Sequence, residues 1–124
     1  MRARPVLTAL ALSLAAQGAC AADKLPTQVG QCTLTRLKSV GTRLDGIPDS
    51  GDAVSYVDGG YQVSFSTIPG LNGAKAGDAV KLCLTDIPDD CPPGDDRGKI
   101  YKATDLRTHR SWSAMNAEHM CGGA

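Results

Sequence analysis

Residues 53–65 read Ala53-Val54-Ser55-Tyr56-Val57-Asp58-Gly59-Gly60-Tyr61-Gln62-Val63-Ser64-Phe65, two runs of alternating apolar and polar side chains around an Asp-Gly turn. Alternation with a period of two indicates strands, and Asp-Gly between such runs is typical of a β-hairpin. A two-residue turn would set Tyr56 opposite Tyr61 and Val54 opposite Val63. We therefore predict one core-facing side that also includes Phe65, with Gln62 and the two serines on the other side.

The same alternation predicts strands at 32–37 and 79–85, and a second, less regular hairpin from 99–104 and 110–112. Residues 87–98 contain three prolines and two glycines, which exclude regular structure there. Only residues 114–120 have a helical composition, and that stretch is too short to be stable alone. We predict an all-β domain, a small disulfide-linked antiparallel barrel or sandwich of five to six short strands, with at most a short C-terminal helix.

The first 22 residues have the organisation of a secretory signal peptide. A basic start is followed by an apolar run at 6–16 and by small residues at 19–22. The apolar run is too short to span a membrane, which takes about 20 residues. We predict cleavage after Ala21 or Ala22 and a periplasmic or secreted product. The alternative is a lipoprotein acylated at Cys20, although Gln17 stands where a lipobox favours leucine.

The domain organisation that follows is a signal peptide at 1–22, a polar segment at 23–31 and a single β domain at 32–124. The whole chain has 13 Lys and Arg against 13 Asp and Glu. Loss of Arg2 and Arg4 with the leader would leave a net charge of −2, which argues against a nucleic-acid partner. An unidentified protein or glycan is the partner that we expect.

Four cysteines remain after cleavage: Cys32, Cys83, Cys91 and Cys121. An exported compartment oxidises such residues, so two disulfides are expected. Three pairings are open. We favour 83–91, which flanks the Pro-Gly loop, and 32–121, which would join the two ends of the mature chain.

Two surfaces are candidate binding sites. The first is the acidic Pro-Gly loop, with Asp89, Asp90, Asp95, Asp96 and Arg97, whose spacing does not match a calcium loop. Turn chemistry is the favoured interpretation of these aspartates, and no metal or cofactor is predicted. The second is an aromatic and basic platform, which would consist of Tyr101, Trp112, Lys99, Lys102 and Arg110. Core packing of the two aromatic residues is the favoured alternative.

The combination Cys83-Leu-x-x-Ile-Pro-x-x-Cys91-Pro-Pro-Gly-Asp-Asp-Arg-Gly98, with His119-x-Cys-Gly-Gly-Ala124 at the C-terminus, resembles a family of small exported Gram-negative bacterial proteins without an assigned function. This resemblance implies an exported location and a cysteine framework, and it carries no catalytic residues. The chain is also similar to small periplasmic β-barrel inhibitors of host lysozyme in having a signal peptide and disulfides. It differs from them in its motifs: Tyr56 follows Ser50-Gly51 at a greater distance than the aromatic residue of the inhibitor motif, and no second motif with Lys and Trp follows at matching spacing.

The sequence contains no catalytic motif, and its two histidines, His109 and His119, lack an adjacent nucleophile. We therefore predict a non-enzymatic periplasmic or secreted binding or envelope-associated module. The alternatives are an inhibitor of a host or envelope-directed hydrolase, and a small hydrolase that combines the acidic loop with a histidine.

Overall fold

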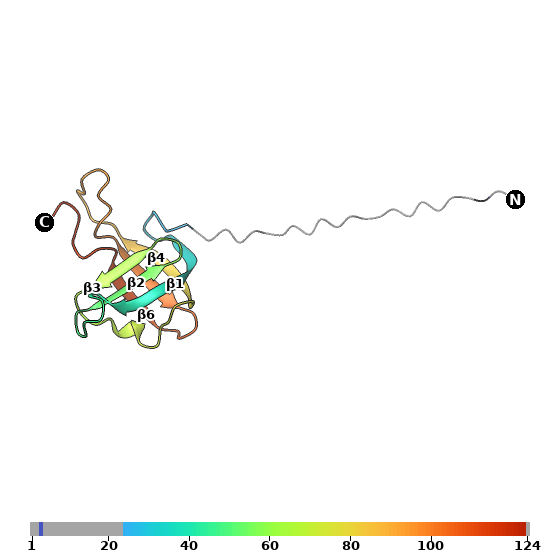
Figure 1. Ribbon diagram of the computed structural model, residues 1–124. Coiled ribbons are helices and arrows are strands. Elements are labelled where there is room, and N and C mark those ends of the chain that lie inside the picture. Colours follow the sequence, from blue (N-terminus) through green and yellow to red (C-terminus); the bar gives the residue numbers. More distant parts are fainter. Residues whose placement is uncertain (1–2, 4–23, 124) are drawn as a thin grey trace.

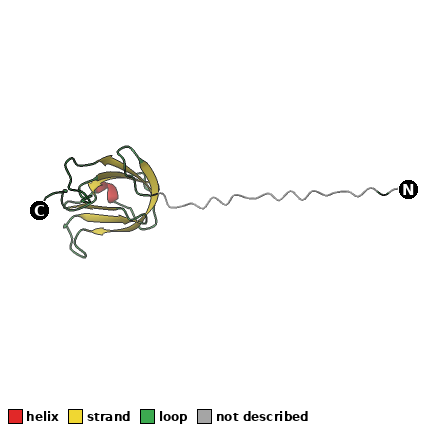
Figure 2. Ribbon diagram, turned by 90° about the horizontal axis from the view of Figure 1, so that it is seen from above, coloured by secondary structure: helices red, strands yellow, loops and turns green. Residues whose placement is uncertain are grey.

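Six antiparallel strands close into a barrel in the computed structural model, which describes residue 3 and residues 24–123 (Figure 1). The strands are β1 (Cys32–Thr42), β2 (Asp52–Tyr56), β3 (Tyr61–Ser64), β4 (Ala79–Asp86), β5 (Ile100–Asp105) and β6 (Ser111–Met115). Their order around the barrel is β1-β2-β3-β6-β5-β4. Figure 2 shows them curving around a common centre. The predicted all-β fold is confirmed as a barrel, and the predicted signal peptide lies outside the described residues apart from residue 3.

The long strand β1 makes closure possible because it pairs with a different strand along each part of its length. Residues 32–36 pair with β4, and residues 37–42 pair with β2. The register shifts between Leu37 and Ser39, where a bulge adds one residue to β1 and bends it. At the opposite side, β3 and β6 share a single register pair, Val63 with Met115.

Helical structure is nearly absent from the described residues. The 3-10 helix η1 (Pro69–Leu71) is the only helix in 24–123. It packs closely on β6, because a Cβ on Gly70 would lie 2.1 Å from the Ser111 carbonyl oxygen. Residues 114–120 end β6 and continue as turns, so the short C-terminal helix that their composition permits does not form.

Side chains alternate between the barrel interior and solvent, as the pattern of residues 79–85 predicts. Val80, Leu82 and Leu84 are at most 1% exposed. They pack with apolar residues of the other strands, including Leu37, Val54, Tyr56, Tyr101, Ala103 and Trp112. The N-terminal segment covers one end of the barrel: Pro26 is buried, and its carbonyl oxygen accepts a hydrogen bond from the Tyr101 hydroxyl at 3.4 Å.

The predicted register of the β2–β3 hairpin is wrong by one residue. Ser55, not Tyr56, lies opposite Tyr61, and the Tyr56 amide donates to the Gly60 carbonyl at 2.9 Å. The loop contains three residues because Gly59 adopts a φ of 92°, which builds a bulge after the turn. As a result Tyr61 and Phe65 are 41% and 56% exposed, contrary to the prediction.

The polar residue Gln62 takes the interior position instead. Its Oε1 accepts from the Tyr56 hydroxyl at 2.5 Å and from Trp112 Nε1 at 3.0 Å. Its Nε2 donates to the carbonyl oxygens of Tyr101 at 2.7 Å and Ala114 at 3.2 Å. Burial raises the pKa of Tyr56, which keeps this hydroxyl a donor. Gln62 thus connects β3 to β5 and β6 at the place where β3 and β6 share only one register pair.

The predicted disulfide pairing is also wrong, although all four cysteines are bonded. Cys32 pairs with Cys83, and Cys91 pairs with Cys121, with Cα–Cα distances of 4.0 and 5.3 Å. The first pair stands directly opposite on β1 and β4, on the outer face. The pairing is decided by the closure of β1 against β4, a contact between residues that are 51 positions apart.

Candidate functional site

The loop between β4 and β5 projects from the barrel beside the C-terminal segment (Figure 1). The Cys91–Cys121 disulfide joins the two segments. The Cys121 amide also donates to the Arg97 carbonyl at 3.1 Å. We call residues 87–99 together with 116–123 the stapled edge. It is held to the C-terminal segment and not, as predicted, to Cys83.

Asp95 and Arg97 hold the loop in shape. The Arg97 guanidinium donates to both carboxylate oxygens of Asp95, at 2.9 and 2.8 Å, and the Gly122 amide donates to Asp95 Oδ2 at 3.0 Å. The hydrogen bonds from the Arg97 guanidinium hold the pKa of Asp95 well below its usual range, and the hydrogen bond from the Gly122 amide lowers it further. Of the five predicted loop residues, these two therefore have internal partners.

The other three predicted loop residues point to solvent. Asp89, Asp90 and Asp96 are exposed, and Asp96 lies 3.5 Å from the Lys99 ammonium in a surface ion pair. Within 24–123 no group of three His, Cys, Asp or Glu residues is placed to hold a metal ion. The loop therefore offers separate surface carboxylates to a partner.

Asn116 is a structural residue of the stapled edge that sequence reasoning missed. Its Oδ1 accepts from the amides of Gly98 at 2.9 Å and Lys99 at 3.1 Å, and its Nδ2 donates to the Asp96 carbonyl at 2.8 Å. An asparagine after a strand has no local pattern that reveals a partner about 20 residues earlier. The side chain supplies backbone hydrogen bonds that an irregular loop otherwise lacks.

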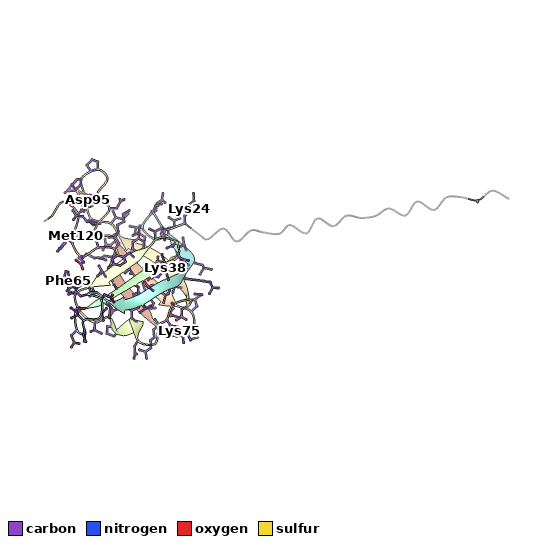
Figure 3. All side chains as sticks on the ribbon, viewed as in Figure 1. Lys24, Lys38, Phe65, Lys75, Asp95 and Met120 are labelled. Carbon is purple, nitrogen blue, oxygen red and sulfur yellow. A yellow bond between two sulfur atoms is a disulfide. The ribbon has the colours of Figure 1, made fainter. Side chains whose placement is uncertain are left out.

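Phe65 forms an exposed cluster next to the stapled edge. The Arg43 guanidinium carbon lies 4.5 Å from the Phe65 ring centroid, and the His119 ring centroid lies 6.3 Å away. Arg43 also forms an ion pair with Glu118 at 3.3 Å. Figure 3 shows Phe65, Met120 and Asp95 along the same edge of the molecule. The cluster was missed because the hairpin pattern placed Phe65 in the core.

A shallow hollow of about 280 Å³ lies beside Phe65, over the place where β3 and β6 meet. Small side chains line much of it, including Ser64, Ser66, Ala114 and Ala117. An exposed ring beside a hollow of small residues is a surface that another protein's side chain could fill.

The predicted aromatic and basic platform is not formed. Tyr101 and Trp112 are only 3% and 4% exposed, so the favoured alternative of core packing is confirmed. Lys99 is paired with Asp96, and Lys102 lies exposed on β5. Arg110 instead borders a second hollow of about 570 Å³, at the η1 end of the barrel.

The two histidines lie in different places relative to the acidic loop, and neither lines one of the two hollows. His109 lies in the turn after β5, whereas the acidic loop precedes β5, so the strand separates them. His119 contacts Phe65, and neither of the two hollows has a histidine in its lining.

An ion pair between the exposed Arg107 and the buried Asp78 fixes the opposite end of the barrel. The Arg107 guanidinium donates to both carboxylate oxygens of Asp78, at 2.7 and 2.9 Å, and to the Gly73 carbonyl at 2.5 Å. The guanidinium holds the pKa of Asp78 well below its usual range. Asp105, the fully buried last residue of β5, accepts from the amides of Arg107 and Thr108. These acids are structural.

Comparison with known proteins adds no relative: no family model, curated protein or solved structure matches the chain. No helix in the part of the chain that the structure describes is long and apolar enough to cross a membrane.

Proposed function

We propose that this protein is a non-enzymatic, exported binding module that presents its stapled edge to a protein partner. Two disulfides in a small barrel suit an oxidising compartment, in agreement with a periplasmic or secreted location. The observation that carries the proposal is the fixation of the projecting loop, which has a disulfide, an ion pair and the Asn116 amide to hold it. A loop that is ordered before binding loses little conformational entropy on binding.

The residues next to the loop suit a protein partner. Aromatic residues and arginine are enriched at interface centres, and Phe65 with Arg43 provides both beside a hollow. Exposed carboxylates at Asp89, Asp90 and Asp96 lie in the loop of the same edge and favour a partner with a basic rim.

The test is affinity capture from an envelope or culture-medium fraction with three immobilised variants. Phe65→Ala removes the exposed ring, and Cys91→Ser with Cys121→Ser frees the loop. Lys75→Ala is the control, because Lys75 lies away from the stapled edge (Figure 3). We expect a partner that binds the wild type and the control but binds Phe65→Ala about 10- to 30-fold more weakly, as truncation of a central interface residue does.

Equal capture by all variants would contradict this role for the stapled edge. A rigid projecting loop also suits an inhibitor that inserts into an enzyme cleft. If the captured partner is a hydrolase, the wild type should inhibit it and the variant without the Cys91–Cys121 disulfide should inhibit it more weakly.

A further inference from the structure

A diagonal row of cations crosses the outer face of β1, β4 and β5. In the strand register Arg36 lies opposite Ala79, Leu34 opposite Lys81, and Cys83 opposite Lys102. Lys81 is thus two residues from Ala79, the partner of Arg36, and two residues from Cys83, the partner of Lys102. Each cation is therefore the diagonal neighbour of the next one on the outer face. Diagonal neighbours in antiparallel sheets are about 7–8 Å apart, so the three form an extended row. We call Arg36, Lys81 and Lys102 the cationic face.

The charge of this face is not neutralised locally. Lys81 and Lys102 are exposed and form no ion pair with any residue in 24–123. Arg36 donates to the uncharged Gly77 carbonyl at 2.9 Å and forms no ion pair with a residue in 24–123. The outward residues of β1, β4, β5 and β6 include one acid, Asp86, at the last position of β4. A local positive field thus exists on a chain with equal numbers of acidic and basic residues.

Hydroxyl groups continue the face toward β6. Ser111 lies opposite Thr104, with 3.0 Å between their hydroxyl oxygens, and Ser113 lies opposite Lys102. Both serines are exposed. Such hydroxyls can exchange hydrogen bonds with the hydroxyls of a sugar. The Cys32–Cys83 disulfide crosses the same face and joins two of its strands.

The chemistry of this face selects among anionic partners. The aromatic residues of these strands, Tyr101 and Trp112, point inward, so the face has no ring on which nucleobases would stack. Leu34 is its one exposed large hydrophobic residue, which is too little for insertion into a bilayer. The row of charges with adjacent hydroxyls fits an extended ligand with repeated anionic groups and sugar hydroxyls.

We propose that the cationic face binds an acidic polysaccharide. This goes beyond the proposed function, because the stapled edge and the cationic face are separate surfaces with separate variants. The protein would thereby be held at an anionic glycan while its stapled edge remains free for a protein partner.

Binding to polygalacturonate at low ionic strength, with neutral dextran as the comparison ligand, tests the proposal. Affinity electrophoresis of the full mature protein gives the dissociation constant at several salt concentrations. Each of Lys81→Ala and Lys102→Ala should weaken binding about fivefold, the factor for loss of one cation at an anionic surface. Lys75→Ala removes the same charge outside the face and should change binding less than twofold. Thermal midpoints should stay unchanged, since these side chains are exposed.

Three results would each overturn the proposal. The first is no retardation by polygalacturonate at low salt. The second is an equal loss of affinity in Lys75→Ala, which would show a general charge effect. The third is equal or tighter binding to single-stranded DNA or to phosphatidylglycerol vesicles, which would assign the face to another class of partner.

Discussion

Replacement of Gln62 by leucine should destabilise the barrel by about 2–6 kcal/mol. The side chain is fully buried and accepts hydrogen bonds from the Tyr56 hydroxyl and Trp112 Nε1. Leucine has a similar size but no acceptor, so both donors would remain buried without a partner. Each such donor costs about 1–3 kcal/mol. Since small domains are stable by about 5–15 kcal/mol, the variant would lose a large part of its stability.

The assay is urea unfolding followed by the fluorescence of Trp112, the single tryptophan. The midpoint should fall with little change in slope, because the surface exposed on unfolding is nearly the same. A matched substitution, Tyr56→Phe, separates the hydrogen bond from general packing. In the wild type it should destabilise by about 1 kcal/mol, the net value of one hydrogen bond. Combined with Gln62→Leu it should be neutral or stabilising, because it removes one unpaired hydroxyl.

The reasoning would be refuted by either of two results. One is a destabilisation below about 1 kcal/mol for Gln62→Leu, less than the lower limit for a single buried unpaired donor. The other is an equal effect of Tyr56→Phe in both backgrounds, which would show that the two side chains are not coupled.

Removal of the Cys91–Cys121 disulfide, which closes a 30-residue separation, should lower stability by about 3–4 kcal/mol on the chain-entropy model, and amide exchange should speed up mainly in the stapled edge. Gly77→Ala, at a φ of 92° in open space, should cost about 1–2 kcal/mol of backbone strain in chemical denaturation. Gly51→Ala should cost more, because its Cβ would also lie 1.9 Å from a β3 carbonyl oxygen; equal losses would contradict the packing. Asp78 has a lowered pKa, so its stabilisation is present above about pH 4 and is lost as the pH falls below that value. Asp78→Asn should therefore flatten the acid limb of a stability–pH profile, and an unchanged limb would refute its role.

Local patterns predicted much of the strand content. In residues 79–85 the alternation of apolar and polar side chains gave the correct inward face, and the four cysteines were correctly expected to be oxidised. These features depend on neighbours within a few residues. The existence of the β2–β3 hairpin was likewise predictable from its Asp-Gly turn.

The candidate site was less predictable, because its contacts are between distant segments. The loop aspartates were visible in the sequence, but the use of Asp95 depends on Arg97 and on Gly122, 27 residues away. Phe65 was assigned to the core, and its exposure follows from one extra residue in the hairpin loop.

The sequence by itself determined an all-β domain with alternating strands, turn positions and four oxidisable cysteines, because those properties follow from backbone preferences and local periodicity. Only the tertiary structure decided which side chain of the hairpin is interior and which cysteines pair. Gln62 is buried because β5 and β6 supply its hydrogen-bond partners, and Cys32 meets Cys83 because barrel closure sets β1 against β4. Both outcomes depend on strands that lie far apart in the chain.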